Sequence, residues 1–297
     1  MSRATALLEA TLVTFLWSTS YVLIKIGLNE IPPLSFAAYR YVTASLLLIL
    51  LFHLNCRKTG KYVRVNSKNL LAFFAMGVFG YFLTQGLQFV GLFYLPAVTV
   101  SFLLNYTPIF VLILSMVFLN EKPSRTQLLG IILSLIGVYI FFLRVQIPYS
   151  DFLGILITLI SGLGWAVYMI LTRYYLKLHK VDIMELTTYS MSFGSLLLFI
   201  TAICTEKRIS ISLSGWAIIL WLSVVSTALA FLLWNHALKT IRAFEQSILQ
   251  NTMLIQITVM TWLFLKEIIT LEKIIGIILV FIGVLIVQIR KNNSDKV

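Results

Sequence analysis

Residues 119–140 read LNEKPSRTQLLGIILSLIGVYI, and residues 265–286 read LKEIITLEKIIGIILVFIGVLI. A leucine, a glutamate, a Gly-Ile-Ile-Leu run and an Ile-Gly-Val triplet recur at a constant offset of 146 positions. That offset is about half of the 297-residue chain. The recurrence therefore indicates a duplicated sequence, with a first unit at 1–146 and a second at 147–297.

The composition places the chain in a membrane. Hydrophobic residues make up 60% of it and charged residues 11%, whereas soluble domains carry about 25% charged residues. Apolar runs of about 20 residues, the length that crosses a bilayer as a helix, are separated by short polar breaks. We predict an all-α integral membrane protein with ten transmembrane helices. The expected spans are 5–27, 34–54, 69–90, 97–118, 126–143, 151–173, 183–203, 214–237, 243–265 and 272–289.

The number of spans in each unit decides how the two units face each other. Trp17 with Lys25 is answered by Trp165 with Arg173, and Asn105 in the fourth span by an asparagine 146 residues later in the ninth. Each unit thus holds five spans, and an odd number makes the second unit enter the membrane from the opposite side. We expect two inverted five-helix repeats, an arrangement that recurs in secondary transporters.

The basic residues support this topology. Sorted by loop, 16 of the 23 lysines and arginines fall on the side of the two termini and six on the other. The positive-inside rule then predicts a multi-pass protein of the cell membrane with both termini cytoplasmic. The net charge of +12 is explained by topology and by anionic lipid headgroups, so no nucleic-acid partner is expected.

Four motifs carry a resemblance to a known family. They are FLWSTSYVLIK (15–25), YRYVTASLLL (39–48), NYTPIFVLILSMVFLNE (105–121) and the glycine-containing fifth span (130–140). In these motifs the chain resembles the drug/metabolite transporter superfamily, in particular proteins with two EamA domains. The resemblance covers nearly the whole chain and implies a ten-helix bundle around a central cavity, with the fifth and tenth helices away from the substrate path.

The second half departs from the pattern in two places. Leu254 stands where the first half has Pro108, and no arginine answers Arg40. Pro108 is expected to kink the fourth span.

Candidate binding residues come from polar and aromatic stripes at helical spacing. Polar groups in hydrocarbon are costly, so they usually face a bundle interior or a cavity. The alternatives are hydrogen bonds between helices and aromatic belts at the membrane interface. We expect the cavity to be lined by Trp17, Ser18, Tyr21, Tyr81, Gln85, Gln88, Asn105, Trp165, Tyr168, Thr227, Gln250 and Asn251.

The ionisable residues of the spans leave several interpretations open. Glu9 and Glu245 lie in first helical turns, where the helix dipole stabilises an acid. His236 is either an interface residue or a proton relay. Arg40 either extends to the interface, pairs with an acid or binds an anion.

These features predict a secondary transporter that moves small organic metabolites by alternating access. The predicted cavity suits neutral or zwitterionic solutes such as amino acids. An exporter is favoured by the resemblance, and an uptake permease of the same fold is the alternative; a channel, a receptor or a membrane-embedded enzyme is less consistent with the residues. No ATP-binding loop of the G-x-x-x-x-G-K-[ST] type is present. We expect no cofactor and no metal, with a proton or another coupling ion left open as a partner.

The glycines of the fifth and tenth spans recur every seven residues, at Gly130 and Gly137 and at Gly276 and Gly283. Small residues at this spacing let helices approach closely. They predict either a scaffold contact within the chain or the contact of a homodimer.

Overall fold

The fold is seen in a computed structural model that describes residues 1–60, 67–95, 97–143, 152–178, 181–207, 210–265 and 269–289. Every regular element in these ranges is a helix, as the apolar composition predicts. The first half contains α1 (Arg3–Gly27), α2 (Pro33–Thr59), α3 (Ser67–Gly77), η1 (Val78–Leu83), α4 (Thr84–Tyr94), α5 (Ala97–Leu104), α6 (Thr107–Phe118) and α7 (Arg125–Phe141). The second contains α8 (Phe152–Leu178), α9 (Ile183–Thr205), α10 (Leu213–Ser223), η3 (Val224–Leu229), α11 (Ala230–Leu238), α12 (Ala243–Gln250), α13 (Thr252–Leu265) and α14 (Leu271–Gln288).

Eight helices of the described chain are long and apolar enough to cross a membrane. The helix α7 is apolar but shorter. The predicted ninth span is covered by α12 and α13 together, which are separated by one residue. Apart from breaks in the fourth and ninth spans and a few end residues, the predicted spans are helical where the structure describes them, and the all-α membrane fold is confirmed. The count of ten crossings stays a prediction.

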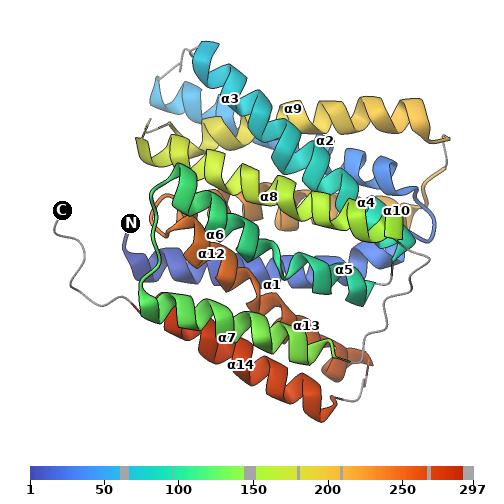
Figure 1. The fold of residues 1–297 in the computed structure, drawn as a ribbon. Coiled ribbons are helices and arrows are strands. Elements are labelled where there is room, and N and C mark those ends of the chain that lie inside the picture. The colour runs from blue at the N-terminus through green and yellow to red at the C-terminus, as the bar shows by residue number, and fades with distance from the viewer. Residues whose placement is uncertain are drawn as a thin grey trace.

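The two halves run in opposite directions and pack into each other. In Figure 1, α1 begins at the end of the bundle where α14 ends, whereas α8 begins at the opposite end and returns. The guanidinium of Arg3 reaches the backbone oxygen of Gln288 at 3.1 Å, which holds the two chain ends together. We call this the termini end. Helices of one half contact helices of the other throughout: α2 packs on α9, α4 and α6 on α8, and α1 on α11 and α13.

The third and eighth spans each contain a π-helical segment at their centre. The two segments, η1 and η3, begin at Val78 and Val224, which are separated by the 146-residue offset of the repeat. A π turn leaves backbone groups without their regular partners, and such turns are frequent at functional sites. At the end of η1, the carbonyl of Phe79 accepts both from the backbone nitrogen of Thr84 and, at 2.6 Å, from its hydroxyl. In η3, side chains from α1 and α2 donate to a backbone carbonyl, that of Ser226.

The fourth and ninth spans are interrupted at equivalent asparagines. Asn105 follows α5, and Asn251 separates α12 from α13. Pro108 lies in the first turn of α6, where proline is tolerated, so the predicted irregularity is present as a break before the proline. The ninth span breaks without a proline, because Leu254 takes that place. Proline alone therefore does not cause the interruption.

The helices α7 and α14 pack antiparallel along one edge of the bundle (Figure 1). The start of α7 is well defined, because Ser124 and Gln127 form a reciprocal capping box at its first turn. A Cβ on Gly137 would lie 2.7 Å from the backbone nitrogen of Val280, so the two backbones touch. The glycine faces of α7 and α14 thus pack against each other within one chain. Of the two predicted alternatives, a scaffold contact and a homodimer contact, the structure shows the scaffold contact.

Candidate functional site

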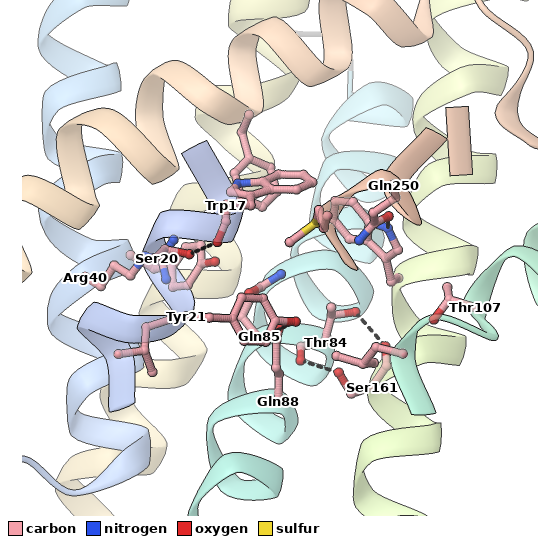
Figure 2. Close-up of a pocket in the computed structure, with 16 residues that line it drawn as sticks. Trp17, Ser20, Tyr21, Arg40, Thr84, Gln85, Gln88, Thr107, Ser161 and Gln250 are labelled. Atoms are coloured by element: carbon pink, nitrogen blue, oxygen red, sulfur yellow. Dashed lines mark hydrogen bonds between the residues drawn. The ribbon is translucent and has the colours of Figure 1, made fainter. Parts of the chain in front are cut away.

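A narrow cavity of about 60 Å³ lies between the two halves in the part of the bundle away from the termini end. Helices of both halves contribute to it: α1, α2, α4, α5 and α6 from the first, and α8, α11, α12 and α13 from the second. Its lining side chains are drawn in Figure 2. They are Trp17, Ser20, Tyr21, Ile24, Arg40, Tyr41, Thr84, Gln85, Gln88, Leu104, Thr107, Ser161, Trp165, Phe231, Gln250 and Met253.

Three glutamines give the cavity its polar character. The amide of Gln88 donates to the hydroxyl of Tyr21 at 3.1 Å, and the indole nitrogen of Trp165 donates to the side-chain oxygen of Gln250 at 3.0 Å. Gln85 belongs to the same lining (Figure 2), and its amide has no hydrogen-bond partner among the described residues. A primary amide offers two donors and an acceptor. Gln85 is therefore ready to bind a solute without breaking an existing contact.

Aromatic rings close the cavity toward the termini end. The ring centroid of Trp17 lies 5.6 Å from those of Trp165 and Phe231, and 4.9 Å from that of Trp234. Trp234 is fully buried. Tilted and edge-on contacts at these distances are favourable geometries for aromatic pairs. The cluster forms an apolar wall across the middle of the bundle.

Between this wall and the termini end, four buried polar side chains form hydrogen bonds with one another. The hydroxyl groups of Tyr81 and Tyr168 are 3.0 Å apart, and Tyr168 also donates to the side-chain oxygen of Asn235 at 3.1 Å. Asn235 in turn donates to the hydroxyl of Thr187 at 2.9 Å. A network with its members paired packs rigidly and leaves no room for a solute.

An ion pair lies nearer the termini end. The guanidinium of Arg173 donates to Glu121 at 2.9 Å and to the backbone oxygens of Leu238 and Lys239 at 2.7 Å. The other carboxylate oxygen of Glu121 accepts from the backbone nitrogen of Ala243, the first residue of α12, at 2.9 Å. Both ionised side chains are buried. The pair ties the loop after α6 to α8, α11 and α12.

The opposite end of the bundle has the equivalent contact in a weaker form. Lys25 and Leu92 in the first half correspond in the repeat to Arg173 and Leu238 in the second. The ammonium of Lys25 donates to the backbone oxygen of Leu92 at 3.3 Å. Equivalent residues of the two repeats thus form contacts at both ends of the bundle. Among the described residues, Arg173 makes more and shorter hydrogen bonds at the termini end than Lys25 makes at the other.

Arg40 enters the cavity from α2. Its guanidinium donates to the hydroxyl of Thr227 at 2.7 Å and to the backbone oxygen of Ser226 at 3.1 Å. The same carbonyl accepts from the indole nitrogen of Trp17 at 3.1 Å. Because Ser226 lies in the π-helical segment η3, its carbonyl is accessible to side chains from α1 and α2.

Six of the twelve sequence-predicted site residues line the cavity, and six do not. Those in the lining are Trp17, Tyr21, Gln85, Gln88, Trp165 and Gln250. The others make contacts around it. Ser18 bonds Gln256, Tyr81 bonds Tyr168, Asn105 bonds the carbonyl of Ser101, Thr227 accepts from Arg40, and Asn251 donates to Ser134.

Several lining residues were absent from the predicted set. Ile24, Leu104, Phe231 and Met253 are apolar, and an apolar residue in a membrane span carries no signal that would single it out. Thr84 and Ser161 belong to the polar stripes, and each bonds the backbone oxygen of the other, at 3.2 and 2.7 Å. Their close packing across α4 and α8 is a tertiary feature that spacing does not reveal.

The sequence and fold were compared with known proteins. The EamA-like transporter family matches this chain twice, over residues 4–143 and 152–289. The uncharacterized transporter YyaM of Bacillus subtilis (strain 168) is 28% identical over 295 residues, covering 93% of this chain and 92% of that protein. An uncharacterized transporter of Archaeoglobus fulgidus is 28% identical over 282 residues, covering 95% of this chain and 97% of its own length.

One solved crystal structure shares the fold. It has a TM-score of 0.81 with 17% sequence identity, and the match covers 96% of this chain and 99% of the other. At this identity the likeness concerns the fold alone. The two family matches lie one in each half of the chain and together cover nearly all of it. The chain therefore belongs to the EamA-like transporter family and is a multi-pass membrane transporter.

Proposed function

We propose that the protein is a secondary transporter that moves small organic metabolites across the cell membrane by alternating access. The observation that carries the proposal is a polar cavity lined by both inverted halves, with the aromatic wall and the Arg173–Glu121 pair between it and the termini end. A cavity of about 60 Å³ is smaller than the 300–1,000 Å³ of typical ligand sites. Its walls must therefore separate for a metabolite to enter and leave.

The equivalence of the two bundle ends supports alternation. At each end a cation of one span donates to a backbone oxygen of another, Lys25 to Leu92 and Arg173 to Leu238. One end can therefore open while the other closes through the same kind of contact. We propose that both termini are cytoplasmic, since 16 basic residues lie on their side. Export is the proposed direction, by resemblance to efflux members of the superfamily, and uptake is the alternative.

The lining suits neutral or zwitterionic solutes of about the size of an amino acid. It combines amide groups, hydroxyls and indole rings with a single charged side chain. Counterflow in proteoliposomes tests the proposal, because a carrier exchanges internal for external solute, whereas a channel merely leaks and a receptor or an enzyme does neither. Wild-type vesicles loaded with amino acids are expected to accumulate the labelled compound. Counterflow with and without a proton gradient would show whether protons are coupled.

Replacing cavity residues is expected to lower transport without lowering the amount of folded protein. Gln85→Ala removes an amide that has no partner among the described residues, so a loss of at least about tenfold would reflect lost solute contacts. Trp17→Ala and Trp165→Ala should also impair transport, since their rings form the wall. Trp221→Ala, at a lipid-facing side chain that is 56% exposed, is the matched control. Wild-type rates in all three cavity variants would rule out this cavity as the transport site.

A further inference from the structure

Arg40 is a buried cation without an anion. Only 3% of the residue is exposed, and no carboxylate lies within ion-pair distance in the part of the chain that the structure describes. Its partners are a hydroxyl, a backbone carbonyl and the ring of Tyr41, whose centroid is 5.4 Å away. A buried charge normally has an ionised partner, because desolvation costs several kcal/mol. Arg173, the other buried arginine, has Glu121.

The sequence left three roles open for Arg40, and the structure removes two of them. The side chain does not extend to the interface, because it turns inward to Ser226 and Thr227 at the centre of the eighth span. It does not pair with an acid of the described chain. Its Nη1 makes no hydrogen bond to these residues, while the side chain forms part of the cavity lining (Figure 2). A planar donor group with an unused nitrogen in a cavity lining matches a carboxylate.

The side chains around Arg40 indicate the chemistry of the rest of a bound solute. The Ser226 carbonyl binds both Arg40 and the indole nitrogen of Trp17, so the cationic group and the aromatic wall are held next to each other. The unpaired amide of Gln85 lies in the same lining. The second half has a serine, Ser190, at the position equivalent to Arg40, since Tyr39 and Ser45 recur as Tyr189 and Ser195, and Arg40 is the one charged side chain of the lining. The site therefore offers one anion-binding point beside a broad apolar surface.

We propose that Arg40 binds the carboxylate of the transported solute, and that this solute is a monocarboxylate with an apolar body, such as an α-amino acid. This assignment rests on the proposed transport function. Thr227 and the Ser226 carbonyl act on Arg40 by fixing the direction of its guanidinium. In a zwitterionic solute, the ammonium group would find the glutamine oxygens and the indole faces, which attract cations.

The test compares solutes that differ only in the carboxylate. Proteoliposomes are assayed for counterflow of a panel of amino acids and arylacetates, each paired with its carboxamide, together with glucose and spermidine. The wild type is expected to exchange carboxylates in preference to their amides. Arg40→Gln is expected to reduce that preference by at least about 30-fold, as for other truncated buried charge contacts, and Arg40→Lys to retain part of it. Thr227→Val should give a smaller loss of the same preference.

The preference ratio separates binding from folding, since a merely structural role of Arg40 would lower both rates together. Lys177→Gln removes an exposed cation in the last turn of α8, outside the cavity lining, and should leave the ratio unchanged. Equal transport of acids and amides by the wild type, or an unchanged ratio in Arg40→Gln, would overturn the assignment. Exchange of glucose or spermidine alone would overturn it while leaving the transport function intact. Exchange of no panel member would count against both.

Discussion

Arg173→Ala is expected to destabilise the protein by about 3–5 kcal/mol, the usual result of removing one partner of a buried ion pair. The substitution leaves Glu121 ionised in a site where its side chain is 4% exposed. It also leaves the carbonyls of Leu238 and Lys239 without their donor. The midpoint of thermal unfolding in detergent measures the effect. Since the pair joins three helices and the loop after α6 near the termini end, the loss should appear as early unfolding of the whole bundle.

Two further variants make the interpretation specific. Glu9→Ala removes an acid that contacts His236 at 2.9 Å in a pair whose histidine is 41% exposed, and a surface pair contributes at most about 1 kcal/mol. It should therefore be close to the wild type. The double variant Arg173→Ala/Glu121→Ala should be more stable than the sum of the single losses, because no lone charge remains. If Arg173→Ala and Glu9→Ala unfold alike, the buried pair does not hold the bundle.

Gly137→Ala is expected to cost about 3 kcal/mol or more, the upper range for overpacked sites, by separating α7 from α14. The added methyl group would lie 2.7 Å from the nitrogen of Val280 and 2.8 Å from the oxygen of Gly276, and neither backbone atom can move alone. Gly283→Ala should behave similarly, since its methyl would meet the Gly130 oxygen at 2.6 Å. Thermal unfolding in detergent again provides the measurement.

Gly86→Ala provides the comparison within the same protein. There the nearest atom to the added methyl is a terminal carbon of Leu198, at 2.9 Å, which a side-chain rotation can remove. Alanine also favours helix over glycine by up to about 1 kcal/mol. Gly86→Ala should consequently be near neutral. A Gly137→Ala protein as stable as the Gly86→Ala protein would contradict close backbone packing between α7 and α14.

The sequence was most informative where it repeated or alternated regularly. The recurring Gly-Ile-Ile-Leu run predicted duplicated halves and, through the span count, their opposite directions in Figure 1. Of the residues predicted from polar stripes, Trp17, Gln85 and Trp165 line the cavity in the structure. These inferences need only the regular α-helical period and the cost of polar groups in hydrocarbon.

Prediction failed where the chain departs from that period or where a partner comes from a distant helix. Tyr81 was assigned to the same stripe as Gln85, but the π-helical segment between them turns Tyr81 toward Tyr168. Asn105 satisfies the carbonyl of Ser101 at the break in its own span, a local need that resembles a binding face in sequence. The partners of Arg40 lie almost 190 positions away, and no spacing rule could supply them.

The paired π segments have a consequence for how a single span is used. One surplus residue rotates everything after it by about 100° relative to a regular α-helix, because each residue advances the helix by that angle. The span built from α3, η1 and α4 therefore presents one side to its neighbours before the shift and a different side after it. A continuous rod of backbone thus combines a packing surface with a solute-facing one. The second half repeats the same change of helix face at η3, in the opposite orientation of the inverted repeat.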